Sequence, residues 1–298
     1  MPVFVNLIAA YSPPTTENNA AFLAIDNYLF EHGVRVPKIV AYDEVRGFFL
    51  MEDLGATMLL EHLTPETVNG HYAEAFAELL KIQQCPPAAH IFPAYDAPKL
   101  LQEMQLFPQW FVQALLGHSL SASEEAMLAE TFEHLLASAQ EQPQVVVHRD
   151  FHSRNLVYAE GISPGVIDFQ DAVIGPVTYD VVSLLRDCYI AWPDEQVNNW
   201  LRAYGAMAMD AGIIPDVPEA QLQGWFDLMG LQRHIKVLGI FARLSLRDGK
   251  HGYLNDLPLV LAYVRRVCHQ HSAMQPFIEW FDKTLLPLAE QQTWYRAG

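Results

Sequence analysis

Hydrophobic and polar residues change their spacing several times along the chain, and each change predicts a different element. An apolar run over residues 2–10 predicts a strand, and an amphipathic pattern over residues 17–32 predicts a helix. β-Branched and aromatic residues predict two further strands, at residues 36–42 and 47–52. From residue 64 to residue 140 nearly every segment has helical periodicity. The pattern therefore predicts a short β-containing region followed by helices.

A second short β region interrupts the helices. Three valines at residues 145–147 predict a strand, and residues 156–158 and 165–169 predict a hairpin. Helical patterns resume at Tyr179 and continue to the end of the chain. Earlier, Ser121 and Glu124 have the spacing of a capping box and predict the start of a helix.

The change from strand-like to helical patterns near Gly55 predicts a domain boundary. Residues 1–54 would form a small part with strands and one helix, and residues 55–298 a large helical part that carries the hairpin. We therefore expect an α+β fold of two unequal parts.

Composition narrows the class of protein. The 298 residues are 51% hydrophobic and 18% charged, which excludes a disordered or collagen-like chain. A net charge of -17 would repel the phosphates of nucleic acids and the headgroups of anionic lipids. The three cysteines lack paired spacing, and no apolar run is long enough to span a membrane. We expect a cytoplasmic protein that binds neither nucleic acid nor membrane.

The residues that carry chemistry follow the three valines. His148, Asp150, His152 and Asn155 lie in one polar loop, and Asp168 follows thirteen residues after Asn155, at the end of the hairpin. Phosphoryl transfer needs such a set, because one carboxylate accepts a hydroxyl proton while an amide oxygen and a second carboxylate hold Mg²⁺ against nucleotide phosphates. His148 and His152 also have the H-x-x-x-H spacing of zinc hydrolases, which binds metal on a helix. The preceding valines favour a strand and loop instead.

The motif H-x-D-x-x-x-x-N followed by I-D-F resembles the protein-kinase-like superfamily, and the chain is similar to its aminoglycoside phosphotransferase and choline kinase branch. The resemblance implies a two-lobed fold with a reduced N-terminal β lobe and a large, mainly helical C-terminal lobe. It implies that Asp150 is the catalytic base and that Asn155 and Asp168 bind the nucleotide through Mg²⁺. His148 would brace the loop, and His152 would touch the transferred phosphoryl group. ATP, or alternatively GTP, would be the phosphoryl donor.

Two structural positions gain a role from the same resemblance. Asp180 matches the carboxylate that opens a helix and holds the backbone of the catalytic loop. Glu17 matches the helix glutamate that pairs with a phosphate-binding lysine, although no partner lysine is identifiable.

The segment at residues 50–55 resembles the hinge between the lobes. Backbone groups of Glu52, Asp53 and Leu54 would then bond to the adenine edge. An ordinary strand end is the alternative.

Longer sequence segments resemble a narrower branch of the superfamily. Ser183-Leu-Leu-Arg-Asp-Cys-Tyr and Gly230-Leu-Gln-Arg-His look most like bacterial kinases that phosphorylate the anomeric hydroxyl of N-acetylmuramate and N-acetylglucosamine in peptidoglycan recycling. The phosphate-covering loop and the strand lysine of a complete N-lobe are not visible, since the first lysine is Lys38. We expect the chain to start inside the N-lobe. The alternatives are an aminoglycoside or other small-alcohol kinase, or a nucleotide-binding remnant with weak or no catalysis.

A basic stripe is expected on a helix over residues 222–247. Arg233, Lys236, Arg243 and Arg247 fall within a sector of about 80° at 100° per residue. Arg233, Lys236 and Arg243 would receive an anionic group of the substrate, such as a lactyl carboxylate. Alternatively, these cations pair with surplus carboxylates of neighbouring helices. The apolar residues on another side of this helix are expected to face the core: Leu231, Ile235, Leu238, Ala242 and Leu246.

Overall fold

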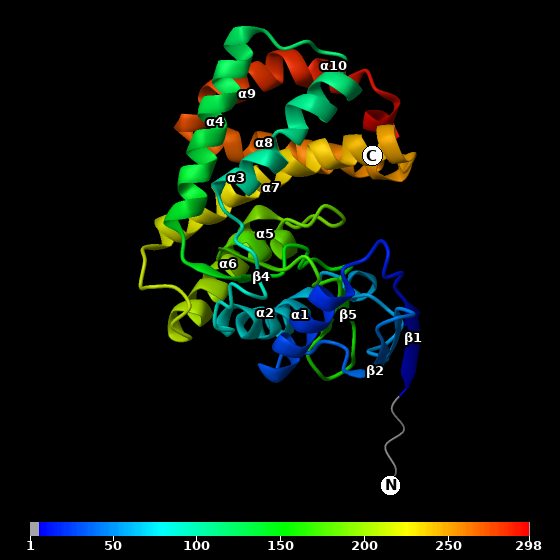
Figure 1. Cartoon of the computed structure of the whole chain (residues 1–298). Coiled ribbons are helices and arrows are strands. Elements are labelled where there is room, and N and C mark those ends of the chain that lie inside the picture. The colour runs from blue at the N-terminus through cyan, green and yellow to red at the C-terminus, as the bar shows by residue number, and fades with distance from the viewer. Residues whose placement is uncertain (1–5, 298) are drawn as a thin grey trace. The chain divides into compact units, whose positions relative to one another are not determined.

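The structure is a computed structural model that describes residues 6–297. The chain forms two compact units (Figure 1). Unit 1 contains residues up to 94, residues 143–185 and residues 198–217. Unit 2 contains residues 95–142, residues 186–197 and the residues from 218 on. The units do not coincide with the expected division near Gly55, which stays a prediction.

Unit 1 contains the small antiparallel sheet that the alternating pattern predicts. Its strands are β1 (Leu7–Tyr11), β2 (Ile39–Asp43) and β3 (Phe48–Glu52), in the order β1-β3-β2. The register pairs Ile8 with Met51, and a shift in β2 falls between Ile39 and Ala41. The part of the expected first strand at residues 2–5 lies outside the described residues.

The helix α1 (Asn19–Glu31) packs against this sheet. The side chain of Asn18 caps it by accepting a hydrogen bond from the backbone N–H of Ala21 at 3.2 Å. The ring of Phe22 meets that of Phe49 edge-on, with the ring centroids 5.4 Å apart. Helix α1 starts two residues later than expected, so Glu17 precedes it in an exposed bend.

The remaining elements of unit 1 frame the polar loop. The strand β4 (Gln144–Val147) pairs antiparallel with β7 (Val173–Pro176), and the expected hairpin consists of β5 (Leu156–Val157) and β6 (Gly165–Val166). Around them lie η1 (Leu59–His62), α2 (Val68–Gln84), α5 (Tyr179–Leu185) and, from residue 198 on, α6 (Asp194–Asp210). The Tyr204 hydroxyl donates a buried hydrogen bond to the side-chain oxygen Oε1 of Gln83 at 2.8 Å, and Nε2 of Gln83 donates to the backbone carbonyl of Val177 at 2.9 Å. They fix α2 and α6 to the segment that follows β7.

Unit 2 is helical, as the periodicity after residue 64 predicts for its segments (Figure 1). The expected capping box starts α4: Glu124 accepts a hydrogen bond from the backbone N–H of Ser121 at 2.7 Å. The longest helix, α7, packs on α3, η2, α4 and α8 around one apolar core. The elements are α3 (Ala97–Met104), the π-helix η2 (Phe107–Leu115), α4 (Ala122–Glu141), α7 (Glu219–Asp248), η3 (His251–Asp256), α8 (Leu257–Gln270), η4 (Ser272–Met274), α9 (Gln275–Trp280), the π-helix η5 (Phe281–Leu285), α10 (Leu286–Glu290) and η6 (Thr293–Ala297).

Gly239 sets how closely α7 approaches its neighbour. A Cβ atom at this position would lie 2.4 Å from the backbone carbon of Leu106 and 2.6 Å from the backbone nitrogen of Phe107, where η2 begins. Real Cβ atoms do not come that close to backbone, so this contact requires glycine. Gly224, on the same helix, has no atom within 4 Å of the equivalent point.

The C-terminal end of α7 departs from the expectation. Leu246 is 48% exposed, so the prediction that it faces the core is wrong. The buried residues of α7 end at Ser245, and residues 246–248 are exposed. Arg247 is also exposed, and its Nε lies 2.7 Å from Oδ1 of Asp248.

Two general expectations about composition can be compared with the structure. Among the described residues, no helix has both the length and the apolar composition needed to cross a bilayer. The three cysteines are buried, free thiols: Cys85, Cys188 and Cys268.

Candidate active site

The polar loop and the hairpin place the predicted chemical residues side by side within unit 1. Strand β4 delivers the chain to His148, and the short hairpin pairs Leu156 with Val166. Beyond the last pair, the backbone N–H of Ile167 donates to the carbonyl of Asn155 at 3.1 Å. Asp168 therefore follows directly at the base of the hairpin, beside Asn155.

The Asn155 side chain joins the three predicted residues. Its amide Nδ2 donates to the backbone carbonyl of Asp150 at 3.0 Å and to Oδ2 of Asp168 at 3.1 Å. Both donated bonds use the nitrogen, which leaves the amide oxygen Oδ1 as the group that can bind a cation. Asp150 is half-buried, and Asp168 is exposed. Residues 5 and 13 positions apart along the chain thus converge on one patch.

His148 is a buried, neutral residue of the loop. Its Nε2 lies 3.0 Å from the carbonyl oxygen of Ile167, so this nitrogen carries the proton. Its Nδ1 accepts a hydrogen bond from the backbone N–H of Asp150 at 3.2 Å. Burial lowers the pKa of His148 from 6.5 to about 4, although the nearby Asp150 carboxylate opposes the shift.

The same geometry decides against the zinc alternative. Residues 148–152 are not helical, and both ring nitrogens of His148 are engaged by the backbone. The H-x-x-x-H spacing therefore does not form the helical metal site of a zinc hydrolase. The side chain of His152 is half-buried, and its backbone closes a turn by donating to the carbonyl of Asp150 at 2.9 Å. Its contact with a phosphoryl group stays a prediction.

Asp180, at the start of α5, holds the backbone of the loop. Its carboxylate is fully buried and accepts hydrogen bonds from the backbone N–H of His148, at 2.7 Å, and of Arg149, at 2.9 Å. Arg149 has φ 75°, which is unfavourable for a residue with a side chain. The two bonds from the loop to Asp180 hold it in this conformation. This is the placement that the resemblance implies for Asp180.

Asp168 is the second strained residue of the site. It has φ 65°, and its Oδ1 accepts a hydrogen bond from Nε2 of Gln170 at 2.7 Å. The following Phe169 is buried and stacks on Phe22 of α1, with the ring centroids 5.2 Å apart. Packing of Phe169 thus anchors the segment that presents the carboxylate.

The donor set fits Mg²⁺. Asp168 and Asn155 offer a carboxylate and an amide oxygen, which are hard ligands, and their side chains are in direct contact. Within residues 6–297 no group of three or more His, Cys, Asp or Glu side chains is placed to hold a metal ion. A site of two protein ligands suits an ion that keeps several waters and shares substrate phosphates.

The predicted hinge lies at the end of β3. Glu52 is its last residue, and the backbone N–H of Asp53 donates to the carbonyl of Asn6 at 3.0 Å. Leu54 packs against the hairpin, since a Cβ atom at Gly165 would lie 2.6 Å from Cδ1 of Leu54. The adenine contacts of Glu52, Asp53 and Leu54 stay a prediction. For Glu17 the expected place on a helix is wrong, because the bend precedes α1.

The residues of the expected basic stripe are largely buried within unit 2. Arg233 and Lys236 are 5% and 7% exposed, and Arg243 is half-buried. Nζ of Lys236 lies 3.0 Å from Oε2 of Glu103, and Nη1 of Arg233 lies 3.6 Å from the sulfur of Cys188. The ion pair favours the structural alternative for Lys236. Substrate contacts of Arg233, Lys236 and Arg243 stay a prediction.

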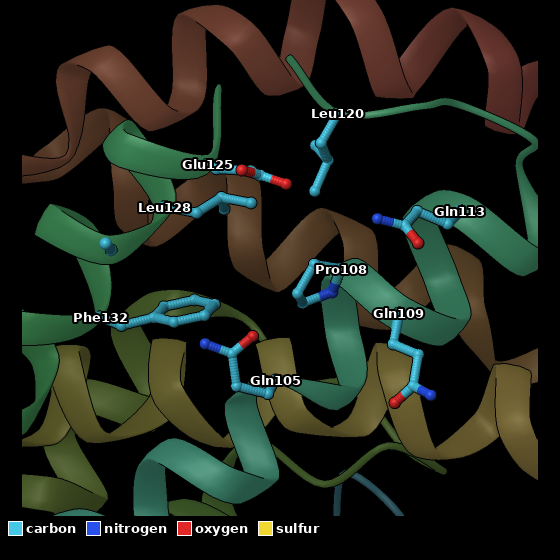
Figure 2. Close-up of a pocket in the computed structure, with 9 residues that line it drawn as sticks. Gln105, Pro108, Gln109, Gln113, Leu120, Glu125, Leu128 and Phe132 are labelled. Atoms are coloured by element: carbon cyan, nitrogen blue, oxygen red, sulfur yellow. The ribbon is translucent and has the colours of Figure 1, made fainter. Parts of the chain in front are cut away.

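Unit 2 also carries a pocket of about 360 Å³ that contains none of the predicted site residues. Figure 2 shows Gln105, Gln113 and Glu125 around the pocket, together with the apolar side chains of Pro108 and Phe132. The polar lining residues are exposed.

Comparison with known proteins identifies the family. Residues 8–216 match the family described as "Phosphotransferase enzyme family". The chain belongs to this family. It is 43% identical over 256 residues to the N-acetylmuramate/N-acetylglucosamine kinase of Pseudomonas putida, with 86% of this chain and 75% of that protein covered. It is 40% identical over 277 residues to the kinase of the same name from Neisseria meningitidis, with 91% and 81% covered.

Solved structures show the fold of the phosphotransferase. A choline/ethanolamine kinase family protein from Mesorhizobium loti aligns with a TM-score of 0.62 at 15% identity, covering 89% of this chain and 83% of that one. The ADP-bound aminoglycoside phosphotransferase APH(2'')-Ib aligns with a TM-score of 0.56 at 15% identity, covering 86% of each chain. These confirm the expected kinase-like α+β fold, with a small sheet near the N-terminus and a large helical region.

Two contacts and one backbone conformation of this phosphotransferase were not predicted from the sequence. They are the bond from Gln170 to Asp168, the strained backbone of Arg149, and the bond from its Nη1 to the carbonyl of Asp171 at 3.4 Å. Only the spacing Asp-x-Gln could have indicated the first. No sequence signal reveals a positive φ at an arginine.

Proposed function

We propose that the protein transfers the γ-phosphoryl group of ATP to a hydroxyl of an amino sugar. The observation that carries the proposal is the convergence of Asp150, Asn155 and Asp168 through the two bonds of the Asn155 amide, at 3.0 and 3.1 Å. These bonds join the Asp150 backbone and the Asp168 carboxylate to one amide. We assign the proton to the Asp150 carboxylate and the cation to the Asp168 carboxylate. Phosphoryl transfer that relies on positioning and charge stabilisation requires one group that takes the hydroxyl proton and another that binds the cation.

In the proposed reaction each residue has a separate task. Asp150 orients the acceptor hydroxyl and takes its proton as the oxygen attacks phosphorus, and ADP leaves with the electrons of the broken P–O bond. Asn155 and Asp168 would hold Mg²⁺, which neutralises charge on the phosphates when it is bound. The buried side chains of His148 and Asp180 accept hydrogen bonds from backbone N–H groups of the loop and so hold it in place.

The acceptor we propose is the anomeric hydroxyl of N-acetylmuramate or N-acetylglucosamine. Its support is the identity of 43% and 40% to two kinases that carry these sugars in their names. An anomeric hydroxyl is more acidic than an ordinary alcohol, so a carboxylate of ordinary basicity suffices as the base. Positioning of the hydroxyl against phosphorus supplies most of the acceleration. The proposed nucleotide is ATP, with GTP as the alternative donor.

Release of ADP in the presence of candidate acceptors tests the function. We expect release with N-acetylmuramate and N-acetylglucosamine, and little with an aminoglycoside or choline. No release with any acceptor, together with measurable nucleotide binding, would favour the remnant instead.

Two variants test the roles of the carboxylates. Asp150→Asn should lower turnover about 100-fold or more while ADP still binds, because only proton transfer is lost. Asp168→Ala should abolish the part of nucleotide binding that depends on Mg²⁺, measured by calorimetry with and without a chelator. Turnover equal to wild type in Asp150→Asn would refute the base, and unchanged Mg²⁺ dependence in Asp168→Ala would refute the ligand.

A further inference from the structure

Arg149 adopts a backbone conformation that costs energy. It lies directly before Asp150, the proposed base, and has φ 75°, in the left-handed region that glycine enters freely and that residues with a side chain avoid. Its backbone N–H donates to Oδ1 of Asp180 at 2.9 Å, a bond that glycine would form equally well. The cost therefore comes from carrying a side chain at this position. Strained residues of this kind cluster at functional sites, which directs attention to the contacts of the side chain.

The Arg149 side chain reaches the segment beyond Asp168. Its Nη1 donates to the backbone carbonyl of Asp171 at 3.4 Å and lies 4.0 Å from Oδ1 of the same residue. The side chain of Arg149 is 16% exposed, whereas that of Asp171 is 67% exposed. An ion pair with an exposed carboxylate contributes little, so the backbone carbonyl is the point of attachment.

The carbonyl of Asp171 belongs to the turn that presents the proposed cation ligand. The turn follows Asp168, whose own backbone is strained at φ 65°, and the N–H of Ala172 closes it by donating to the carbonyl of Phe169 at 3.0 Å. Because Phe169 is buried, one side of the turn is anchored by packing. The bond from Arg149 holds the other side.

Two bonds described above fix the chain up to Asp168 but not beyond it. One runs from His148 to the carbonyl of Ile167 at 3.0 Å, and the other from Asn155 to Asp168 itself at 3.1 Å. The bond from Arg149 attaches three residues after Asp168, so the carboxylate is held from both directions along the chain. Loss of this bond leaves the turn able to rotate about Asp168 relative to the loop that carries the base.

We propose that Arg149 is a positioning residue that fixes the placement of the Asp168 carboxylate relative to the Asp150 carboxylate. The inference rests on the phosphotransferase site proposed above. Arg149 acts through the turn and takes no proton and no cation itself. In-line transfer depends on the placement of the attacking oxygen against phosphorus, and a displacement of about 1 Å can cost about 100-fold in rate.

The test compares the kcat of phosphoryl transfer to N-acetylglucosamine, the KM for ATP and the dissociation constant of ADP in saturating Mg²⁺. Arg149→Ala should lower kcat about tenfold or more. The KM for ATP and the dissociation constant of ADP should stay within about twofold of wild type, because Asn155 and Asp168 remain in contact. A loss of nucleotide affinity that accounts for the whole loss of rate would overturn the proposal.

Arg149→Gly separates positioning from stability. Glycine relieves the strain at φ 75°, so the melting temperature of this variant should exceed that of Arg149→Ala by about 2 °C or more. Both variants lack the guanidinium and should lose kcat to the same extent. A kcat near wild type in the glycine variant would assign Arg149 to the stability of the loop and overturn the proposal.

Arg46 provides a matched control. It is an exposed arginine of unit 1, and its Nε lies 3.7 Å from Oδ2 of Asp43. Arg46→Ala should leave kcat within about twofold of wild type. A loss equal to that of Arg149→Ala would show that removal of any arginine pair lowers the rate, and the proposal would fall.

Failure of the proposed function gives a different result. Hydrolysis of ATP, with water as the acceptor, reads out the same geometry without any sugar. If the wild type phosphorylates no amino sugar but hydrolyses ATP, and both Arg149 variants slow the hydrolysis, the acceptor is wrong and the role of Arg149 stands. If the wild type binds ADP but neither transfers nor hydrolyses, both proposals fail.

Discussion

Replacement of His148 by glutamine isolates the stability that depends on a neutral imidazole. The native ring donates from Nε2 to the Ile167 carbonyl and accepts at Nδ1 from the Asp150 backbone. A proton added at Nδ1 would face another donor, inside a fully buried site. Glutamine can donate and accept in the same two directions but does not titrate.

The size of the effect follows from the pKa. The pKa of His148 is lowered from 6.5 to about 4, so between these values the unfolded chain binds a proton that the folded chain does not. The contribution of a neutral His148 is complete above pH 6.5 and is lost as the pH falls toward 4. For this shift, linkage gives a loss of about 2 kcal/mol of unfolding free energy between pH 7 and pH 5.

Urea denaturation at several pH values measures the effect. Other groups contribute to the pH dependence of both proteins, so the quantity to compare is the difference between wild type and His148→Gln. Between pH 7 and pH 5, the unfolding free energy of the wild type should fall by about 2 kcal/mol more than that of His148→Gln. Parallel curves for the two proteins would show that His148 is not held neutral in the folded state.

Three further predictions concern burial, packing and substrate. Burial raises the pKa of Asp26 from 3.8 to about 7, and its Oδ1 has no hydrogen-bond partner among the described residues. Asp26→Asn should therefore add about 2 kcal/mol to the unfolding free energy at pH 8, and this gain should shrink as the pH falls toward 4. A lower unfolding free energy for Asp26→Asn at pH 8 would contradict the prediction. Gly239→Ala should lower the melting temperature by several degrees in a thermal scan, whereas Gly224→Ala should raise it slightly, and equal effects would refute the close approach. If the basic side chains bind the substrate carboxylate, Arg233→Glu should raise the KM for N-acetylmuramate more than for N-acetylglucosamine; equal KM changes would assign Arg233 to structure.

The chemical residues could be predicted because their arrangement is local. A strand, a loop of fixed spacing and a short hairpin fully determine that Asn155 and Asp168 meet, and the sequence contains all three signals. The strand β7 was missed, since Val173–Pro176 is short and contains Gly175 and Pro176, which usually indicate a turn. Its pairing with β4 depends on contacts that no local pattern encodes.

Tertiary burial also overrides what a helical pattern shows. On α1 the buried side includes Asp26 beside Ile25 and Leu29, and a carboxylate there looks like a solvent-facing residue in the sequence. On α7 the basic residues cluster as predicted by periodicity, but Arg233 and Lys236 are buried rather than presented as an open stripe. Periodicity fixes which residues share a side of a helix, and the neighbouring elements decide whether that side is covered.

The assignment of three separate stretches of sequence to each unit has a consequence for how the protein can be made and divided. During synthesis, unit 1 lacks its last stretch until residue 217 has left the ribosome, by which time most of unit 2 is still missing. No single truncation can yield either unit alone. A protease that cuts the chain once, where it passes from one unit to the other, would leave parts of both units in at least one of the two fragments. Fragment studies of this phosphotransferase should therefore recombine several peptides.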